Sequence, residues 1–167
     1  IITRSLRKED GTIVHGGFTN NVWVDTPYFT SAVLARSYTV TRLRRYAFEA
    51  IRQCLNHARY LRDEATQCYV HDIDLEKHVR SKSLWGRGNG CIFLALADTL
   101  AACPPVTKGY DQLLQVYREL AGGLIRFQHP SGLWRIIIDD PYSHLETSGS
   151  AMILGGLAIG IKNCWLD

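Results

Sequence analysis

Apolar residues recur at steps of three and four positions along five parts of the chain, the spacing that gathers them on one side of an α-helix. In the clearest of these parts, charged residues such as Arg45 and Arg52 fall on the opposite side. Pro27 stands in the first turn of the first helix, where its missing N–H is not needed, and Pro104 ends the third. The predicted helices cover Thr26 to Val40, Thr41 to Arg62, Gly90 to Ala102, Asp111 to Gln128 and Ser148 to Trp165.

Two segments between these helices, Gln67 to Asp72 and Leu133 to Asp139, are predicted to be extended, because each follows a helix and a turn signal such as Pro130-Ser131-Gly132. The resulting order favours antiparallel helical hairpins packed side by side, with the longer loops at one end. No fixed short period repeats, which argues against a tetratricopeptide or ankyrin array. We expect an all-α fold with short extended segments in its loops.

Composition places the chain among ordinary globular proteins. Its 167 residues are 46% hydrophobic and include five Phe, four Trp and eight Tyr, so it is not a disordered chain. The nearest approach to a membrane span, Met152 to Ile161, is too short, and no membrane partner is expected. A net charge of +3 without a basic stripe gives no reason to expect nucleic acid binding. No signal peptide is visible, and we expect a cytoplasmic protein.

The cysteine pattern does not predict a metal centre. Five cysteines are scattered along the chain without a Cys-x-x-Cys pair, whereas metal ligation usually uses local pairs. Several of them fall on apolar helical faces, where a free thiol behaves as a small hydrophobic group. Reduced, buried thiols are therefore favoured over disulfides. The five positions are Cys54, Cys68, Cys91, Cys103 and Cys164.

Polar and aromatic residues gather in four clusters near the predicted loops. In the first, His15 precedes Asn21 to Asp25, and Asp25 stands directly before a helix. A carboxylate there caps the helix or serves as an acid in a cleft, and both interpretations stay open. The second cluster surrounds His71, and a histidine between apolar residues is more often structural than functional.

The third cluster, Leu84 to Cys91, places three glycines around Arg87 just before an apolar helix. Glycines in this number indicate close approach of the backbone, but the spacing fits neither a P-loop nor a dinucleotide fingerprint. In the fourth cluster, Glu146 precedes residues that suit a helix cap. Asp139 and Asp140 together with Glu146 offer an alternative, the carboxylate pair of a conventional glycosidase.

Three of these segments, taken in order, resemble one family: Asn21 to Asp25 (NVWVD), Trp85 to Gly90 (WGRGNG) and Leu145 to Met152 (LETSGSAM). They look like the unsaturated rhamnogalacturonyl and glucuronyl hydrolases of glycoside hydrolase families 105 and 88. The resemblance implies part of an (α/α)6 barrel built from helical hairpins. It also implies hydration of the C4=C5 bond of a Δ4,5-unsaturated uronyl oligosaccharide, galacturonyl-rhamnose in particular, with no cofactor.

The resemblance assigns roles residue by residue. Asp25 matches the general acid/base, and the substrate-binding positions are His15, Trp23, His71, Trp85 and Arg87. At Cys91 the family motif commonly has an aromatic residue, so one stacking face is absent here. A second active-site Asp of the family lies upstream of the matched region and has no counterpart in the first twenty residues. An inactive fragment or sugar-binding relic of the same scaffold is therefore the alternative function.

The length of the chain changes the picture once a barrel is expected. Twelve helices of ~17 residues with ~5-residue connections need about 260 residues. We therefore expect residues 1–167 to form a single barrel-type domain that is incomplete at both ends. Apolar helix faces left exposed at its edges would favour self-association.

Overall fold

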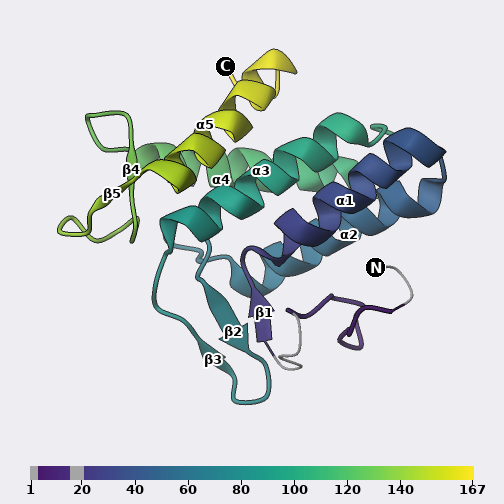
Figure 1. Ribbon diagram of the computed structural model, residues 1–167, viewed down its shortest axis with the longest axis horizontal. Coiled ribbons are helices and arrows are strands. Elements are labelled where there is room, and N and C mark those ends of the chain that lie inside the picture. Colours follow the sequence, from purple (N-terminus) through teal and green to yellow (C-terminus); the bar gives the residue numbers. More distant parts are fainter. Residues whose placement is uncertain (1–3, 16–20) are drawn as a thin grey trace.

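A computed structural model describes residues 4–15 and 21–167 of the chain. Its helices follow the predicted order and number within the described residues (Figure 1). They are α1 (Thr26–Thr41), α2 (Arg44–Leu61), α3 (Gly86–Ala102), α4 (Tyr110–Arg126) and α5 (Thr147–Lys162).

The helices pack in two rows (Figure 1). In the first row α3 lies between α1 and α5, while α2 and α4 pack against this row from one side. The pairs α1–α2 and α3–α4 are the predicted hairpins. Because α3 has neighbours on both sides, it buries most of its side chains, and Phe93 at its centre stacks on Tyr117 of α4 with ring centroids 4.8 Å apart. The Tyr117 hydroxyl donates to the carbonyl oxygen of Gly156 in α5 at 2.8 Å, so one residue joins three helices.

Several helix boundaries differ from the prediction. α3 begins at Gly86 instead of Gly90, because packing holds the glycine segment in helical conformation. α2 begins at Arg44 instead of Thr41, since Arg42, with φ of 59°, turns the chain between α1 and α2. α5 ends at Lys162 instead of Trp165, whose N–H folds back to the carbonyl oxygen of Gly160 at 2.9 Å.

Five short strands lie among the described residues: β1 (Asn21–Trp23), β2 (Asp72–Asp74), β3 (Val79–Arg80), β4 (Trp134–Arg135) and β5 (Leu145–Glu146). β1, β2 and β3 form an antiparallel sheet in that order, and β4 pairs with β5. Within the predicted extended segment Gln67 to Asp72, a bridge at Tyr69 and the first residue of β2, Asp72, are confirmed, whereas Gln67, with φ of 63°, is not extended. Within Leu133 to Asp139, only β4 and a bridge at Ile137 are confirmed. Each of these short extended stretches is defined by pairing with another part of the chain and not by its own sequence.

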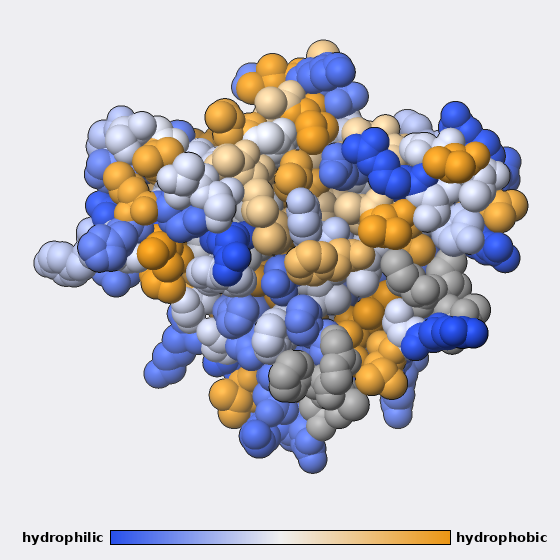
Figure 2. All heavy atoms as spheres, in the orientation of Figure 1, coloured by the Kyte–Doolittle hydropathy of each residue, from blue (hydrophilic) through white to orange (hydrophobic). Residues whose placement is uncertain are grey.

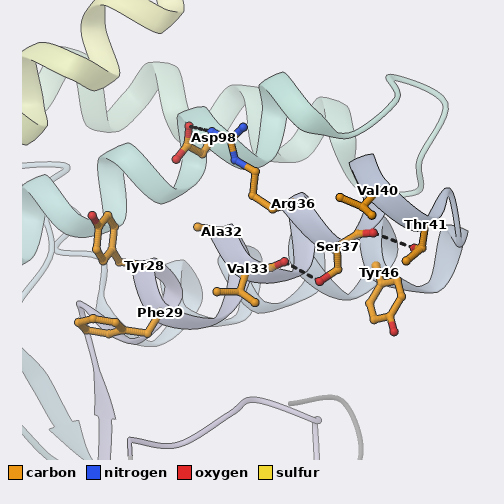
Figure 3. Close-up of a pocket in the computed structure, with 10 residues that line it drawn as sticks. All are labelled: Tyr28, Phe29, Ala32, Val33, Arg36, Ser37, Val40, Thr41, Tyr46 and Asp98. Carbon is orange, nitrogen blue, oxygen red and sulfur yellow. Dashed lines mark hydrogen bonds and ion pairs between the residues drawn. The ribbon is translucent and has the colours of Figure 1, made fainter.

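Both edges of the first helical row expose apolar side chains, as expected. On α1, Phe29 is 57% and Val40 83% exposed, and on α5 Leu154 is 64% exposed. A groove of about 710 Å³ runs along the exposed face of α1, where Arg36 pairs with Asp98 of α3 (Figure 3). Figure 2 shows hydrophobic side chains spread over the helices and mostly hydrophilic ones around the sheet below. Self-association through these faces stays a prediction.

Three further observations bear on the class of protein. Across the described residues, no helix combines the length and apolar character needed to cross a bilayer. All five cysteines are free thiols, four of them buried as expected, whereas Cys164 is exposed. No group of three or more His, Cys, Asp or Glu side chains suited to a metal occurs in the described part of the chain.

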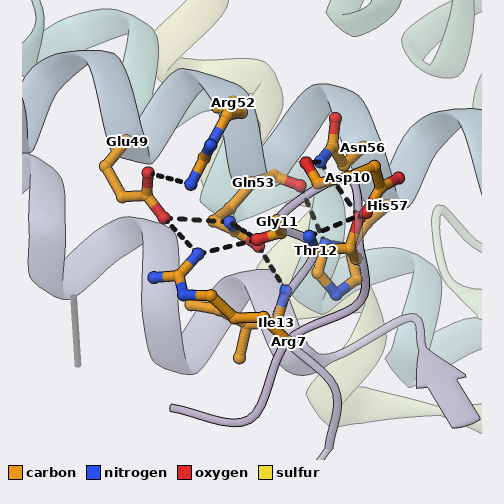
Figure 4. Close-up of polar contacts among 10 residues, drawn as sticks. All are labelled: Arg7, Asp10, Gly11, Thr12, Ile13, Glu49, Arg52, Gln53, Asn56 and His57. Carbon is orange, nitrogen blue, oxygen red and sulfur yellow. Dashed lines mark hydrogen bonds and ion pairs between the residues drawn. The ribbon is translucent and has the colours of Figure 1, made fainter. Parts of the chain in front are cut away.

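Residues 7–13 form a small hairpin that lies on α2 through buried polar contacts (Figure 4). Glu49 of α2 accepts hydrogen bonds from Arg7 and Gln53, at 2.7 and 3.0 Å. Below them His57 is fully buried, and its Nδ1 lies 2.8 Å from the carbonyl oxygen of Gln53. Burial disfavours the charged imidazolium and lowers the pKa of His57 to about 4.

This buried histidine predicts a loss of stability in mild acid. The pKa of His57 lies below the 6.5 of a free histidine, so the unfolded chain takes up the proton first. The free energy of unfolding should therefore fall as the pH falls from 6.5 toward 4, by at most about 1.4 kcal/mol per pH unit for this one proton. Urea unfolding at several pH values measures the slope. The variant His57→Gln should show a shallower slope, and an unchanged slope would contradict the assignment.

Candidate active site

Five of the six predicted site residues form one continuous row of rings and a guanidinium. His15 stacks on Trp23 with centroids 4.2 Å apart and planes 12° apart. Trp23 lies 5.4 Å from His71, and His71 meets the edge of Trp85 at 5.0 Å. The guanidinium of Arg87 lies 4.5 Å over the Trp85 ring, within cation–π range. All are half-buried except Arg87, which is exposed, so the row has an accessible side.

Strand pairing brings Trp23 and His71 together. β1 and β2 pair with Trp23 opposite Asp72, which puts His71 beside Trp23. The backbone of His71 is held on both sides, since its carbonyl oxygen accepts from Val24 N at 2.9 Å and its N–H donates to Ser83 O at 3.0 Å. The sheet is thus a scaffold for the two rings.

The N-terminus of α3 carries Trp85 and Arg87 and is packed too tightly for side chains at its glycines. A Cβ at Gly86 would lie 2.2 Å from the carbonyl oxygen of Arg135, and one at Gly88 would lie 2.4 Å from a methyl group of Val24. The predicted close approach of the backbone at this segment is therefore confirmed. Its cause is the packing of β1 and β4 against the first turn of α3.

Asp25 occupies the N-cap position of α1, yet its side chain makes no capping hydrogen bond. Its Oδ1 is buried and has no hydrogen-bond partner among the described residues, and the same is true of Nδ1 of His71. Buried polar atoms are nearly always paired, so these two atoms are available to hydrogen-bond a ligand.

The thiol of Cys91 lies within electrostatic range of Asp25, Arg87 and Glu146. The pKa of this thiol is raised to about 11, mainly by burial, with the negative charges of Asp25 and Glu146 acting in the same direction and Arg87 acting against them. Asp25 and Arg87 therefore act on the same small region at the start of α3. The Cys91 thiol contacts the Met152 sulfur at 3.6 Å, which joins this region to α5.

The fourth cluster behaves as capping and turn residues. Glu146 is the N-cap of α5 and accepts from the backbone N–H groups of Ser148 and Gly149. Partial burial would raise the pKa of Glu146, but these bonds, the Ser148 hydroxyl and the charge of Arg87 lower it overall. Asp140 accepts from Tyr142 N at 2.9 Å in a turn. These contacts favour the cap interpretation over a conventional pair of catalytic carboxylates.

Sequence reasoning missed one neighbour of the row. The hydroxyl of Thr26 lies 3.2 Å from Nδ1 of His15 and is itself buried. A hollow of about 420 Å³ opens beside these two residues, between residues 4–6 and α1. Nothing in the sequence marks Thr26 as different from any other residue in the first turn of a helix.

A model of one protein family, described as Glycosyl Hydrolase Family 88, matches residues 1–167. The chain belongs to glycosyl hydrolase family 88. Family membership confirms the resemblance on which the candidate site residues were chosen. The individual roles of these residues stay predictions.

Relatives of known structure or activity cover this family member over most of its length. It is 32% identical over 142 residues to the unsaturated rhamnogalacturonyl hydrolase YesR of Bacillus subtilis, a match covering 84% of this chain and 41% of that protein. It is 27% identical over 156 residues to the unsaturated 3S-rhamnoglycuronyl hydrolase of Formosa agariphila, covering 87% and 41%. A solved structure of a possible family 105 member from Salmonella enterica superposes with a TM-score of 0.89 at 26% identity, covering 99% of this chain and 46% of that one.

Two consequences follow from these matches. The two helical rows are part of an (α/α)6 barrel, as the resemblance implied. The chain spans less than half the length of each of these three proteins.

The different bonding of Asp25 and Glu146 predicts different effects on stability. Asp25→Ala removes no capping hydrogen bond, so the free energy of unfolding should change by less than about 0.5 kcal/mol. Glu146→Ala removes a genuine cap and should lower it by about 1 kcal/mol. Thermal or urea unfolding compares the two variants. Equal losses would show that Asp25 is a structural cap and not an acid kept for another purpose.

Proposed function

We propose that this chain supplies the acid/base carboxylate and part of the sugar-binding surface of a hydrolase acting on Δ4,5-unsaturated uronyl oligosaccharides. The observation that carries the proposal is the buried, unpartnered Oδ1 of Asp25. Family membership supports the reaction class. The names of both relatives join an unsaturated uronyl group to rhamnose. The name of the Bacillus subtilis protein supports a galacturonyl-rhamnose substrate, such as pectin-type polymers yield.

The chemistry needs one carboxyl group. The C4=C5 bond of the unsaturated sugar is an enol ether, because C5 also carries the ring oxygen. The Asp25 carboxyl protonates C4, and the positive charge on C5 is shared with the ring oxygen. Water then bonds through its oxygen to C5 and returns a proton to Asp25. The hemiketal at C5 opens to a ketone, and the hemiacetal left at C1 releases the remaining saccharide.

The row of rings and Arg87 fits the binding of such a sugar. Flat faces of Trp23 and Trp85 suit the apolar faces of a pyranose ring, and Nδ1 of His71 is available for a hydroxyl or carboxylate. Arg87 is exposed over Trp85, so its forked N–H groups are free to meet the uronate carboxylate. In this proposal His15 holds the face of Trp23 opposite to the sugar.

A sugar-binding relic without turnover is the rival function. It uses the same rings and Arg87 but gives Asp25 no chemical role. The family match along the whole chain favours the hydrolase. The two functions differ in whether the double bond of the substrate disappears.

Turnover is expected to depend on Asp25. The chain is incubated with an unsaturated galacturonyl-rhamnose disaccharide, and loss of the ultraviolet absorbance of the double bond is followed. Asp25→Asn should reduce the rate by about 10²-fold or more, because the amide neither donates nor accepts the transferred proton. Asp140→Asn, which changes a carboxylate in a turn, is the matched control and should retain the rate. No absorbance loss by the natural sequence above a buffer blank, with a native circular dichroism spectrum, would reject the hydrolase proposal for this chain.

Arg87 is expected to act mainly in binding. Arg87→Ala removes a charge-assisted contact to the uronate, which should raise KM about tenfold or more with a smaller effect on kcat. Arg80→Ala changes another exposed arginine, whose guanidinium bonds the carbonyl oxygen of Arg62, and should leave KM unchanged. Steady-state kinetics on the same disaccharide measures both. Unchanged KM and kcat would place Arg87 outside the substrate contact.

A further inference from the structure

Two buried side-chain amides, those of Asn89 and Gln53, form hydrogen bonds with the backbone of the segments that carry His71 and His15. Both side chains are 0% exposed, and both come from helices. Long or branched apolar residues normally fill such positions, because a buried amide is costly unless every polar atom is paired. Their pairing therefore shows which parts of the chain they hold.

Asn89, in the first turns of α3, binds the segment before His71. Its Oδ1 accepts from the backbone N–H of Tyr69 at 2.8 Å, and its Nδ2 donates to the carbonyl oxygen of the same residue at 2.8 Å. The second N–H of Nδ2 donates to the carbonyl oxygen of Trp85 at 3.0 Å. One amide thus joins the backbone two residues before His71 to the backbone of Trp85.

Gln53, in the middle of α2, forms equivalent hydrogen bonds with the segment before His15 (Figure 4). Its Oε1 accepts from the backbone N–H of Ile13 at 2.8 Å. Its Nε2 donates to the carbonyl oxygen of Gly11 at 2.8 Å and to Glu49 at 3.0 Å. Ile13, like Tyr69, stands two residues before a site histidine.

The parallel between the two amides is the basis of the proposal. We propose that Asn89 and Gln53 are the positioning residues of His71 and His15, each fixing its histidine by clamping the backbone two residues earlier. The proposal deepens the proposed function, on which the importance of the two histidines rests. Neither amide touches the row of rings, so both act through the backbone.

The role requires an amide, which donates and accepts at the same time. Tyr69 presents an N–H and a carbonyl oxygen to Asn89, so the side chain must offer both kinds of atom. Without Asn89, the His71 segment would keep the bonds of His71 itself to Val24 and Ser83 but lose its tie to Trp85. The distance between the His71 and Trp85 rings is then no longer set from both sides.

The first test uses the natural sequence and hydrogen exchange. The amide protons of Tyr69 and Ile13 lie outside the helices, yet both are buried donors to a carboxamide. They are expected to exchange as slowly as amides in the middle of α2 or α3. Exchange as fast as that of exposed loop amides would overturn the proposal.

The second test follows the histidine ring signals by NMR in chains with ¹³C-labelled histidine. In Asn89→Ala, the Cε1–H signal of His71 should move toward its position in the unfolded chain, while the His15 signal stays. In Gln53→Ala the His15 signal should move and the His71 signal stay. Thr99→Ala is the control, because Thr99 is also a 0% exposed polar residue of α3 but contacts Cys54 instead of a histidine segment.

The outcomes distinguish a specific effect on one histidine from a general loss of packing in the variant. Signals that stay in place in folded variants, or that move together in all three variants, would overturn the proposal. If an alanine variant does not fold, the exchange rates in the natural sequence decide. None of these measurements needs turnover, so an inactive chain would reject the proposed hydrolase function without affecting this result.

Discussion

The close packing at the first turn of α3 is the contact on which the rest of the site depends. Gly86 lies against the carbonyl oxygen of Arg135, and Gly88 lies against Val24, at distances that leave no room for a Cβ. Val24 separates Trp23 from Asp25 in the chain, so its position fixes both. A side chain at Gly88 would push Val24 away from α3. The glycines therefore determine how closely the segment with Trp23 and Asp25 lies against the first turn of α3.

Stability and site chemistry are distributed differently over the molecule. The central helix α3 and the stack of Phe93 on Tyr117 supply the packed core, and Glu146 shows that this chain does use a carboxylate as a helix cap. Asp25 stands in the same kind of position and forgoes that bond, while Nδ1 of His71 also lacks a partner among the described residues. An unpaired buried polar atom reduces stability until a ligand or water completes its bonding.

The local sequence pattern predicts the helices well because each buries one regular face. α2 and α4, with their strong apolar periodicity, were located to within a few residues. The start of α3 was missed, because glycine-rich sequence indicates a loop unless the packing around it is known. β1 and β2 pair although α1 and α2 separate them in the sequence, so no local signal reveals that Trp23 contacts His71. The site residues themselves came from a family resemblance, whereas the amides of Asn89 and Gln53 look like ordinary polar helix residues.

Within the described residues, contacts between two strands and the first turn of one helix fix the geometry of the candidate site. β1, β2 and the first turn of α3 position Trp23, His71 and Trp85, and the contacts involved are backbone pairing, glycine packing and buried amides. The apolar faces exposed on α1 and α5 take no part in these contacts. What covers those faces therefore affects the stability of the helical rows more directly than the relative positions of the rings. The contacts that position the site residues therefore lie within the described residues and do not depend on what covers the exposed faces of α1 and α5.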